Sequence, residues 1–186
     1  IMNEWFNGKK VALVGNAASL FDKKYGAEID EHEVVVRLNK AAMLFTRMDV
    51  STSHGSLTTH WLFYTTGEYS HKFGNIPQNI KKGHMSTFRQ TAMNKKSVDW
   101  MMPADEHDIL KDLLGHKNPT TGLMSIYWIS KCLPKSLDVY GFDWKETPTF
   151  TDMERKKDPS CHHDYVKERD LCFNRYFTQP NIKWRN

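Results

Sequence analysis

Short, continuous apolar runs that end in glycine or asparagine form the dominant pattern of this chain. The run at residues 11–14 leads into Gly15 and Asn16, and the run at residues 34–36 is soon followed by Asn39. Such runs, rich in β-branched residues, are typical of strands in a parallel sheet that is buried on both faces. The pattern predicts strands at residues 11–14, 33–38, 60–65, 84–88, 137–142 and 182–184, the last at a sheet edge.

Helical periodicity predicts helices between these strands. Gly26 is expected to end the first helix, Pro103 to begin the second, and Ser160 to cap the last. The polar stretch 144–159 is expected to be a long loop. The predicted helices cover residues 17–25, 103–114, 123–133 and 161–177. Because strands and helices alternate, we predict one α/β domain over residues 1–186, with a mainly parallel sheet and helices on both faces.

The first strand, its turn and the helix after it are arranged like the phosphate-facing edge of a nucleotide-binding unit. A turn at Gly15 needs no Cβ, and a helix start at Ala17 would offer free N–H groups to an anion. The segment lacks both the Gly-x-Gly-x-x-Gly and the Gly-Lys-Ser/Thr patterns. An ordinary first turn of an α/β domain is therefore an equal alternative.

Two further strand ends carry polar side chains that suit a ligand. Asn39 can donate and accept hydrogen bonds, which suits a ribose or a pyrimidine base, although it could equally cap its own turn. Thr120, Thr121 and Gly122 begin the helix at 123–133, where hydroxyls and free N–H groups could form a second anion site. A plain threonine cap, without any ligand, is the alternative.

Composition narrows the class of protein. The chain has 186 residues, 26 Lys and Arg against 22 Asp and Glu, and a net charge of +4, which suits an anionic ligand without implying nucleic acid. It has no apolar run of the roughly 20 residues that span a bilayer. Three scattered cysteines, Cys132, Cys161 and Cys172, indicate free thiols in a reducing compartment, so we expect a cytoplasmic protein.

Four segments, in this order, resemble the sialyltransferase family, glycosyltransferase family 29. Residues 11–16 and 25–41 resemble the large motif of that family, and residues 49–53 loosely resemble the tail of that motif. Residues 118–122 with 139–142 resemble the small motif, and His163 with Glu168 matches the short His-x-x-x-x-Glu motif. Residues 55–117 match no motif.

The resemblance implies a Rossmann-like, GT-A-like fold and inverting transfer of a sugar acid from a cytidine monophosphate (CMP) donor to an acceptor hydroxyl. It implies that His163 is the catalytic base and that Glu168 gives structural support. It places Gly15, Asn16, Ser19 and Asn39 at the donor nucleotide, and Thr120, Thr121 and Gly122 at its phosphate or acid. His162 is a candidate for the donor-phosphate histidine.

The chain also departs from the family. The disulfide that joins the two long motifs in animal members has no equivalent, because Val11 stands at the first position and Cys132 does not align with the second. A compact bacterial, phage or viral member is therefore expected. The aromatic motif that precedes the last histidine motif is not recognisable, and Ala17 replaces the serine that follows the Gly-Asn turn.

The chemistry of these residues agrees with the resemblance. A hydroxyl nucleophile needs a base such as His163, and a nearby helix start would keep its ring neutral. Glu168 lies ~140° further around an ideal helix, so we expect it to brace loops and not to pair with His163. No Asp-x-Asp pattern is present, and a zinc site at residues 161–164 is disfavoured because four sequence neighbours rarely face one ion.

The sequence therefore predicts a metal-independent transferase that moves sialic acid from a CMP-sugar to a glycan, without a cofactor and without a nucleic-acid partner. One alternative is a transferase of another ulosonic acid, such as the Kdo of surface polysaccharides. A second alternative is a non-catalytic module that binds a nucleotide or a glycan.

Overall fold

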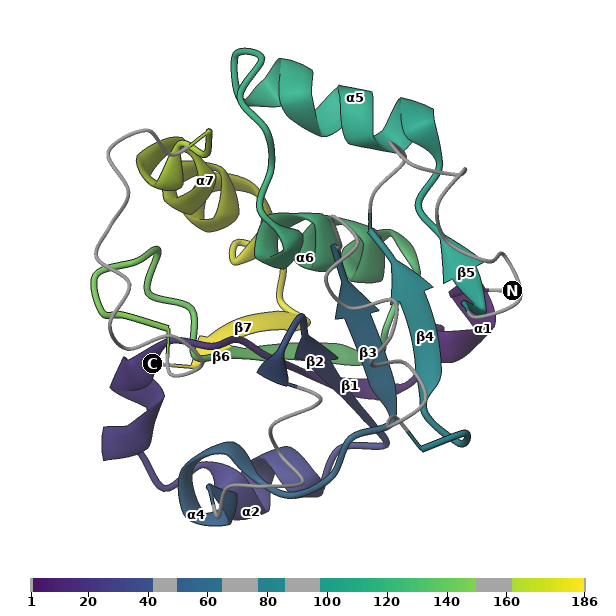
Figure 1. Ribbon diagram of the computed structural model, residues 1–186, viewed down its shortest axis with the longest axis vertical. Coiled ribbons are helices and arrows are strands. Elements are labelled where there is room, and N and C mark those ends of the chain that lie inside the picture. The colour runs from purple at the N-terminus through teal and green to yellow at the C-terminus, as the bar shows by residue number, and fades with distance from the viewer. Residues whose placement is uncertain (1, 42–49, 65–76, 86–97, 150–161, 186) are drawn as a thin grey trace.

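The computed structural model describes residues 2–41, 50–64, 77–85, 98–149 and 162–185. In these residues seven strands form one sheet in the order β5-β4-β3-β2-β1-β6-β7, and every neighbouring pair is parallel (Figure 1). The strands are β1 (Lys10–Val14), β2 (Val34–Leu38), β3 (His60–Phe63), β4 (Lys81–His84), β5 (Trp100–Met101), β6 (Ser136–Tyr140) and β7 (Ile182–Arg185). The predicted α/β fold with a parallel sheet is confirmed.

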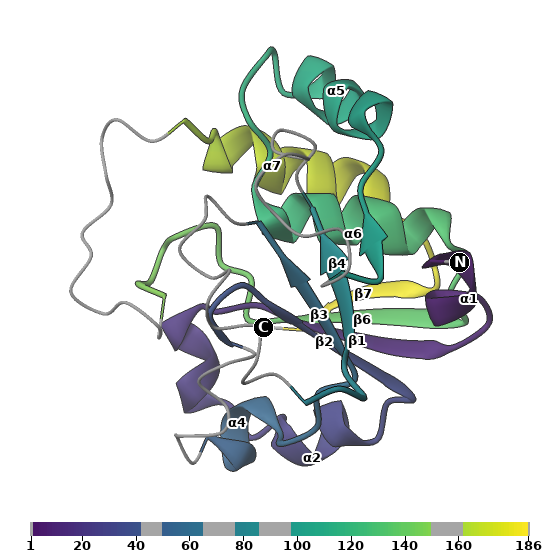
Figure 2. The same ribbon diagram turned by 45° about the vertical axis from the view of Figure 1, so that its right-hand side comes forward.

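Helices lie on both sides of the sheet (Figures 1 and 2). One side carries α5 (Ala104–Leu113), α6 (Thr121–Lys131) and α7 (Tyr165–Leu171), which continues as the π-helical turn η4 (Cys172–Tyr176). The other side carries the 3₁₀ helix η1 (Ala18–Asp22), α2 (Gly26–Asp30) and α4 (Ser51–His54), and α1 (Met2–Phe6) precedes β1. None of the helices in the described ranges is long and apolar enough to cross a membrane.

Alternate side chains of β1 enter two different cores. Val11 and Leu13 belong to the larger core, which α5, α6 and η4 complete. Ala12 and Val14 belong to a smaller core on the other face, together with Leu20. Because neighbouring strand residues point to opposite faces, a central strand that is buried on both faces must be apolar throughout. This requirement explains the continuous apolar runs of the sequence.

The segment after β1 differs from the predicted helix at residues 17–25. It forms η1 and then α2, and Gly26 begins α2 instead of ending a helix. A Cβ at Gly26 would overlap the carbonyl oxygen of Ser51, so glycine is needed where α2 meets α4. Contacts with a distant segment thus decide the helix boundaries here.

The last helix begins later than predicted. Asp164 caps α7, and its carboxylate accepts a hydrogen bond from the backbone N–H of Lys167 at 3.1 Å. Ser160, the predicted cap, lies outside the described residues. β4 begins at Lys81, before the predicted strand at 84–88, of which residues 86–88 lie outside the described residues. The sequence did not predict α1, α4 or the two-residue β5.

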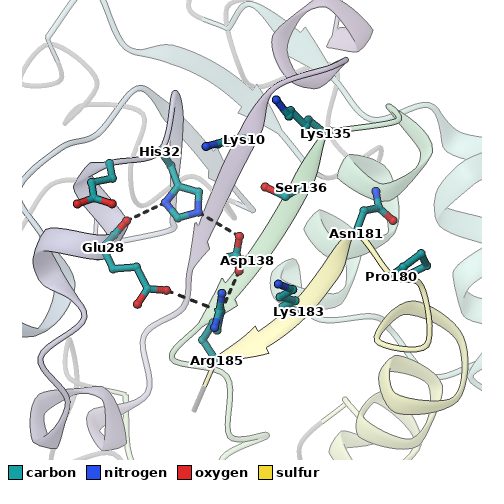
Figure 3. Close-up of a pocket in the computed structure, with 11 residues that line it drawn as sticks. Lys10, Glu28, His32, Lys135, Ser136, Asp138, Pro180, Asn181, Lys183 and Arg185 are labelled. Carbon is teal, nitrogen blue, oxygen red and sulfur yellow. Dashed lines mark hydrogen bonds and ion pairs between the residues drawn. The ribbon is translucent and has the colours of Figure 1, made fainter.

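A charged network joins α2 to the edge of the sheet (Figure 3). His32 Nδ1 lies 2.9 Å from the carbonyl oxygen of Glu28, and His32 Nε2 lies 3.2 Å from a carboxylate oxygen of Asp138. Neither oxygen can donate, so both contacts are hydrogen bonds only when the ring carries a proton on each nitrogen, as an imidazolium. Burial opposes this charge, but the hydrogen bond with Asp138 raises the pKa of His32 overall. Arg185 Nε donates to the same carboxylate at 2.9 Å.

This network predicts a pH-dependent contribution to stability. The folded pKa of His32 lies above its unfolded value of about 6.5, so the contribution is complete below that pH and is lost as pH rises through the folded pKa. We expect His32→Gln to lower the free energy of unfolding by about 2 kcal/mol near pH 5.5, with the difference shrinking toward alkaline pH. Urea unfolding of both proteins as a function of pH measures this difference in the free energy of unfolding.

His116→Gln is the matched control, because His116 is 85% exposed while its ring nitrogen also lies 3.4 Å from a carboxylate, that of Asp112. Its unfolding free energy should follow that of the wild type at every pH. A difference for His32→Gln that grows as pH rises would contradict the imidazolium assignment.

Candidate functional site

A cavity of about 370 Å³ opens where β1 and β6 end. The strand order reverses between these two strands, and ligands of open parallel sheets bind outside the carboxyl ends at such a switch point. Most of the residues predicted to form the site line this one cavity. They are Gly15, Asn16, Asn39, Thr120, Thr121, Gly122, His163 and Glu168.

Two glycines bring the chain segments together here. A Cβ at Gly15 would overlap the carbonyl oxygen of Gly141 and lie 2.7 Å from the ring of Phe142. A Cβ at Gly122 would lie 2.5 Å from the opposite edge of the same ring. Phe142 therefore fits between the turn after β1 and the start of α6 because both positions lack a side chain.

The turn after β1 does not offer the free N–H groups that its sequence predicted. Gly15 donates to the carbonyl oxygen of Tyr140 at 2.7 Å, Ala17 to that of Gly141 at 3.1 Å and Ala18 to that of Pro148 at 2.9 Å. These donors are thus used by β6 and by the loop after it, and the anion site at this turn stays a prediction. Ser19 is also turned to that loop, where its hydroxyl donates to Asp143 at 3.2 Å.

Asn16 and Asn39 extend from neighbouring strand ends. Asn16 Nδ2 donates to the carbonyl oxygen of Leu38 at 3.3 Å, while its buried Oδ1 has no donor among the described residues. Asn39 has a left-handed backbone (φ 49°); its Oδ1 accepts from Tyr64 N–H at 3.0 Å, and its Nδ2 donates to Thr121 Oγ1 at 3.3 Å. Asn39 thus joins the ends of β2 and β3 to α6.

The start of α6 retains free donors at the cavity. Thr120 caps the helix, and its hydroxyl accepts from Leu123 N–H at 3.1 Å. Within the described ranges no group accepts from the N–H of Thr121 or of Gly122, both of which line the cavity. These N–H groups lie at the positive end of the helix dipole. The anion site predicted at residues 120–122 therefore has free donors in a position to bind an anion.

Glu168 braces the start of α6 from α7. Its carboxylate accepts from the backbone N–H of Thr120 at 2.8 Å and from the hydroxyl of Thr120 at 2.6 Å. Only 2% of the residue is exposed, and this burial raises its pKa to about 7. The predicted bracing role agrees with this geometry.

His163 is held across the cavity on the segment before α7. Its Nδ1 lies 2.7 Å from the carbonyl oxygen of Asn118, which can only accept, so Nδ1 carries a proton and Nε2 of the neutral ring is the free base. Burial is the main reason that the pKa of His163 is lowered, and the charge of Lys145 contributes. His162 is exposed and does not line the cavity; its carbonyl oxygen accepts from Asn118 N–H at 3.3 Å.

The loop after β6 supplies lining residues that were not predicted. Phe142, Trp144, Lys145 and Thr149 come from this loop, and Tyr165 comes from the first turn of α7. The sequence offered one indication that this loop lines the site. The predicted strand at 137–142 ends next to β1 at the switch point, where ligands of such sheets bind. The stretch that resembles the small motif of the family ended at Phe142, so it gave no information on the loop.

The parallel sheet, with a cavity at its switch point and a histidine across it, defines a Rossmann-like α/β domain with a ligand site at the strand ends. Residues 7–113 match the glycosyltransferase family 29 (sialyltransferase) profile, so the chain belongs to this family. The match includes most of residues 55–117, where no motif was recognisable.

Curated relatives and solved structures agree with this family. CMP-N-acetylneuraminate-beta-galactosamide-alpha-2,3-sialyltransferase 1 of Mus musculus is 30% identical in an alignment of 167 positions, which covers 72% of this chain and 44% of that protein. The Gallus gallus protein of the same name is 39% identical in an alignment of 170 positions, which covers 74% of this chain and 45% of that protein. The chain thus spans somewhat less than half of these relatives.

A crystal structure of a mammalian sialyltransferase superposes with a TM-score of 0.70 at 20% identity and covers 96% of this chain and 69% of that chain. A second one, in complex with Gal-beta-1-3GalNAc-ortho-nitrophenol, superposes with a TM-score of 0.67. At this identity the similarity establishes the fold.

The contact between Glu168 and Thr120 predicts a difference between two variants. Glu168→Ala leaves the Thr120 N–H without an acceptor and should lower the free energy of unfolding by about 2–3 kcal/mol. Glu168→Gln keeps an amide oxygen for that N–H and should cost less than about 1 kcal/mol. Urea unfolding near pH 7 compares the two. Equal losses would show that the hydrogen bonds to Thr120 are not what Glu168 contributes.

Proposed function

We propose that this chain is the catalytic portion of a sialyltransferase that moves a sialic acid from a CMP donor to a glycan hydroxyl. The observation that carries the proposal is that His163 Nε2 and two helix N–H groups, none of which has a hydrogen-bond partner among the described residues, share one cavity at the switch point. A base and an anion site are the two elements that transfer from a nucleotide sugar requires.

The donor nucleotide would lie over the ends of β1 and β2. The Oδ1 of Asn16 lacks a donor among the described residues, and a buried acceptor of this kind is expected to find one in the bound ligand. A ribose hydroxyl or the amino group of cytosine can supply it. The N–H groups of Thr121 and Gly122 would then face the phosphate.

The proposed reaction uses His163 as the general base. Nε2 takes the proton of the acceptor hydroxyl, and the oxygen attacks the anomeric carbon on the face opposite to CMP. The bond from that carbon to the phosphate oxygen breaks, CMP leaves with the electron pair, and the configuration is inverted. The carbonyl oxygen of Asn118 fixes the tautomer in which Nε2 is free. The phosphate is already a good leaving group, so the helix N–H groups can stabilise it without a metal ion.

The names of the relatives suggest the substrates. They name CMP-N-acetylneuraminate as donor and a β-galactosamide as acceptor, with α-2,3 linkage. We propose the same donor and a galactose-terminated acceptor for this chain. The alternative is a donor that carries another ulosonic acid. Assays with a panel of CMP-sugars distinguish it from the sialic acid donor.

The nucleotide specificity can be measured directly by thermal unfolding. CMP at about 100 times its dissociation constant should stabilise the fold by roughly 2.7 kcal/mol, because a ligand that binds only the folded state shifts the equilibrium. UDP, GDP, NAD and S-adenosylmethionine at the same concentration should give no shift. A shift with another nucleotide and none with CMP would refute the proposed donor class.

The base assignment predicts a split between binding and turnover. His163→Ala should lower kcat by about 10²–10⁴-fold, the usual contribution of a general base, with CMP affinity nearly unchanged. In the wild type the acid limb of the kcat/KM profile, which reports the free enzyme, should lie below pH 6.5, because the pKa of His163 is lowered. His116→Ala, at an exposed histidine outside the cavity, is the control.

Near-normal turnover of His163→Ala would refute the assignment of the base. Binding of CMP without product from any CMP-sugar would instead identify the chain as a nucleotide-binding module.

A further inference from the structure

A second cavity, of about 560 Å³, lies over β6 and β7 on the face of the sheet that carries α2 (Figure 3). Glu28 of α2 borders it on one side, and Pro180 and Asn181 of the turn before β7 border it on the other. None of the described residues lines both this cavity and the candidate functional site. Its volume falls within the range of small-molecule sites, roughly 300–1,000 Å³, so the cavity can hold a ligand of its own.

The strand register places the polar side chains of this cavity on one face. Ser136 lies opposite Lys10, and Asp138 lies opposite Lys183, and residues paired across neighbouring strands point to the same side of a sheet. The residues that alternate with them, such as Leu137, belong to the larger core on the other side. Parallel sheets are usually apolar on both faces, so the charged face over β6 and β7 is an exception within this sheet.

Two acidic residues of the lining are already balanced by cations of the protein. Asp138 is 7% exposed, and its carboxylate contacts His32 at 3.2 Å and Arg185 at 2.9 Å. Glu28 accepts from the hydroxyl of Tyr140 at 2.7 Å and lies 3.7 Å from Arg185. These two carboxylates therefore do not cancel the charge of the other cations around the cavity.

Three lysines of the lining have no partner for their ammonium groups. Lys10, Lys135 and Lys183 are exposed, and none of these ammonium groups forms an ion pair or a hydrogen bond with another described residue. Glu31, also exposed, is the third acidic residue of the lining. The hydroxyl of Ser136 likewise has no hydrogen-bond partner among the described residues and can donate to an oxygen. The cavity thus has an excess of two positive charges, which matches an anion with two negative charges.

We propose that this cavity binds a small molecule that carries a phosphate group, through the ammonium groups of Lys10, Lys135 and Lys183. The proposal does not depend on the proposed function. In the register of β1, β6 and β7, Lys10 and Lys183 are two strands and two residues apart, which puts their Cα atoms roughly 12 Å from each other. Two extended lysine side chains can meet at one anion across that span, and Figure 3 shows the three lysines around the same cavity.

The chemistry of lysine favours a phosphate over a singly charged anion. Its ammonium group is a compact point charge with three donors, and the attraction grows with the charge of the ligand. A phosphate ester is mostly doubly charged at pH 7, whereas a sulfate ester carries one charge. Because the lysines are exposed, salt screens the attraction, so we expect the affinity to fall as the salt concentration rises.

The test is isothermal titration of the whole chain near pH 7 at constant ionic strength. The probes are inorganic phosphate, glucose 6-phosphate, glucose 6-sulfate and glucose. We expect saturable binding of the two phosphates, weaker binding of the sulfate ester and none of glucose. Tighter binding of glucose 6-phosphate would identify an organic phosphate ester as the ligand class, and tighter binding of inorganic phosphate would identify the free anion.

A double variant locates the binding. Lys10→Gln together with Lys183→Gln should weaken binding of the tighter phosphate by about five- to thirty-fold, the range for two exposed charge pairs. Lys24→Gln together with Lys81→Gln removes the same charge at two exposed lysines that line neither cavity, and should bind as the wild type does within about two-fold. Urea unfolding checks that both variants fold.

Three outcomes would overturn the proposal. One is a wild type that binds neither phosphate. Another is a folded variant at Lys10 and Lys183 that binds phosphate as tightly as the wild type, as expected if the phosphate binds at the start of α6. The third is an equal loss in the variant at Lys24 and Lys81, because the loss would then follow net charge alone. None of these outcomes bears on the proposed function, which CMP binding tests separately.

Discussion

The close approach of β1 and β6 at their carboxyl ends determines the rest of the site. Gly15 and Gly141 lie in contact there, and the ring of Phe142 fills the space that leads to Gly122 at the start of α6. A side chain at either Gly15 or Gly122 would move Phe142 and with it the loop after β6. The cavity therefore depends on a backbone contact that only glycine permits.

One short segment, residues 118–120, holds both the proposed base and the proposed anion site. Asn118 exchanges hydrogen bonds with both His162 and His163, and Thr120 is held by Glu168. Because this segment leads directly into α6, the histidine and the helix N–H groups cannot move independently. Positioning of this kind is worth more to a transferase than additional contacts, since the reacting groups must be aligned before transfer occurs.

Predictions from the sequence succeeded where local pattern and burial agree. The strands were recognisable because a parallel sheet that is covered on both faces needs apolar runs, and Thr120 was recognisable as a helix cap because capping is local. The sequence did not indicate that donors of the turn after β1 are taken by Pro148 and by Thr147, which is 128 residues away from Ser19 in the sequence. No local pattern contains such a contact, and Lys145 was missed for the same reason.

The pKa of Glu168 is raised and that of His163 is lowered for the same reason. Burial disfavours the charged form of any group, so it raises the pKa of the carboxyl to about 7 and lowers that of the imidazole. Near neutral pH the histidine is uncharged and ready to accept a proton, while the charge of the carboxylate beside the anion site is partly suppressed. Because a full negative charge on Glu168 would repel an anionic ligand, the burial of Glu168 is compatible with the anionic donor that we propose for this cavity.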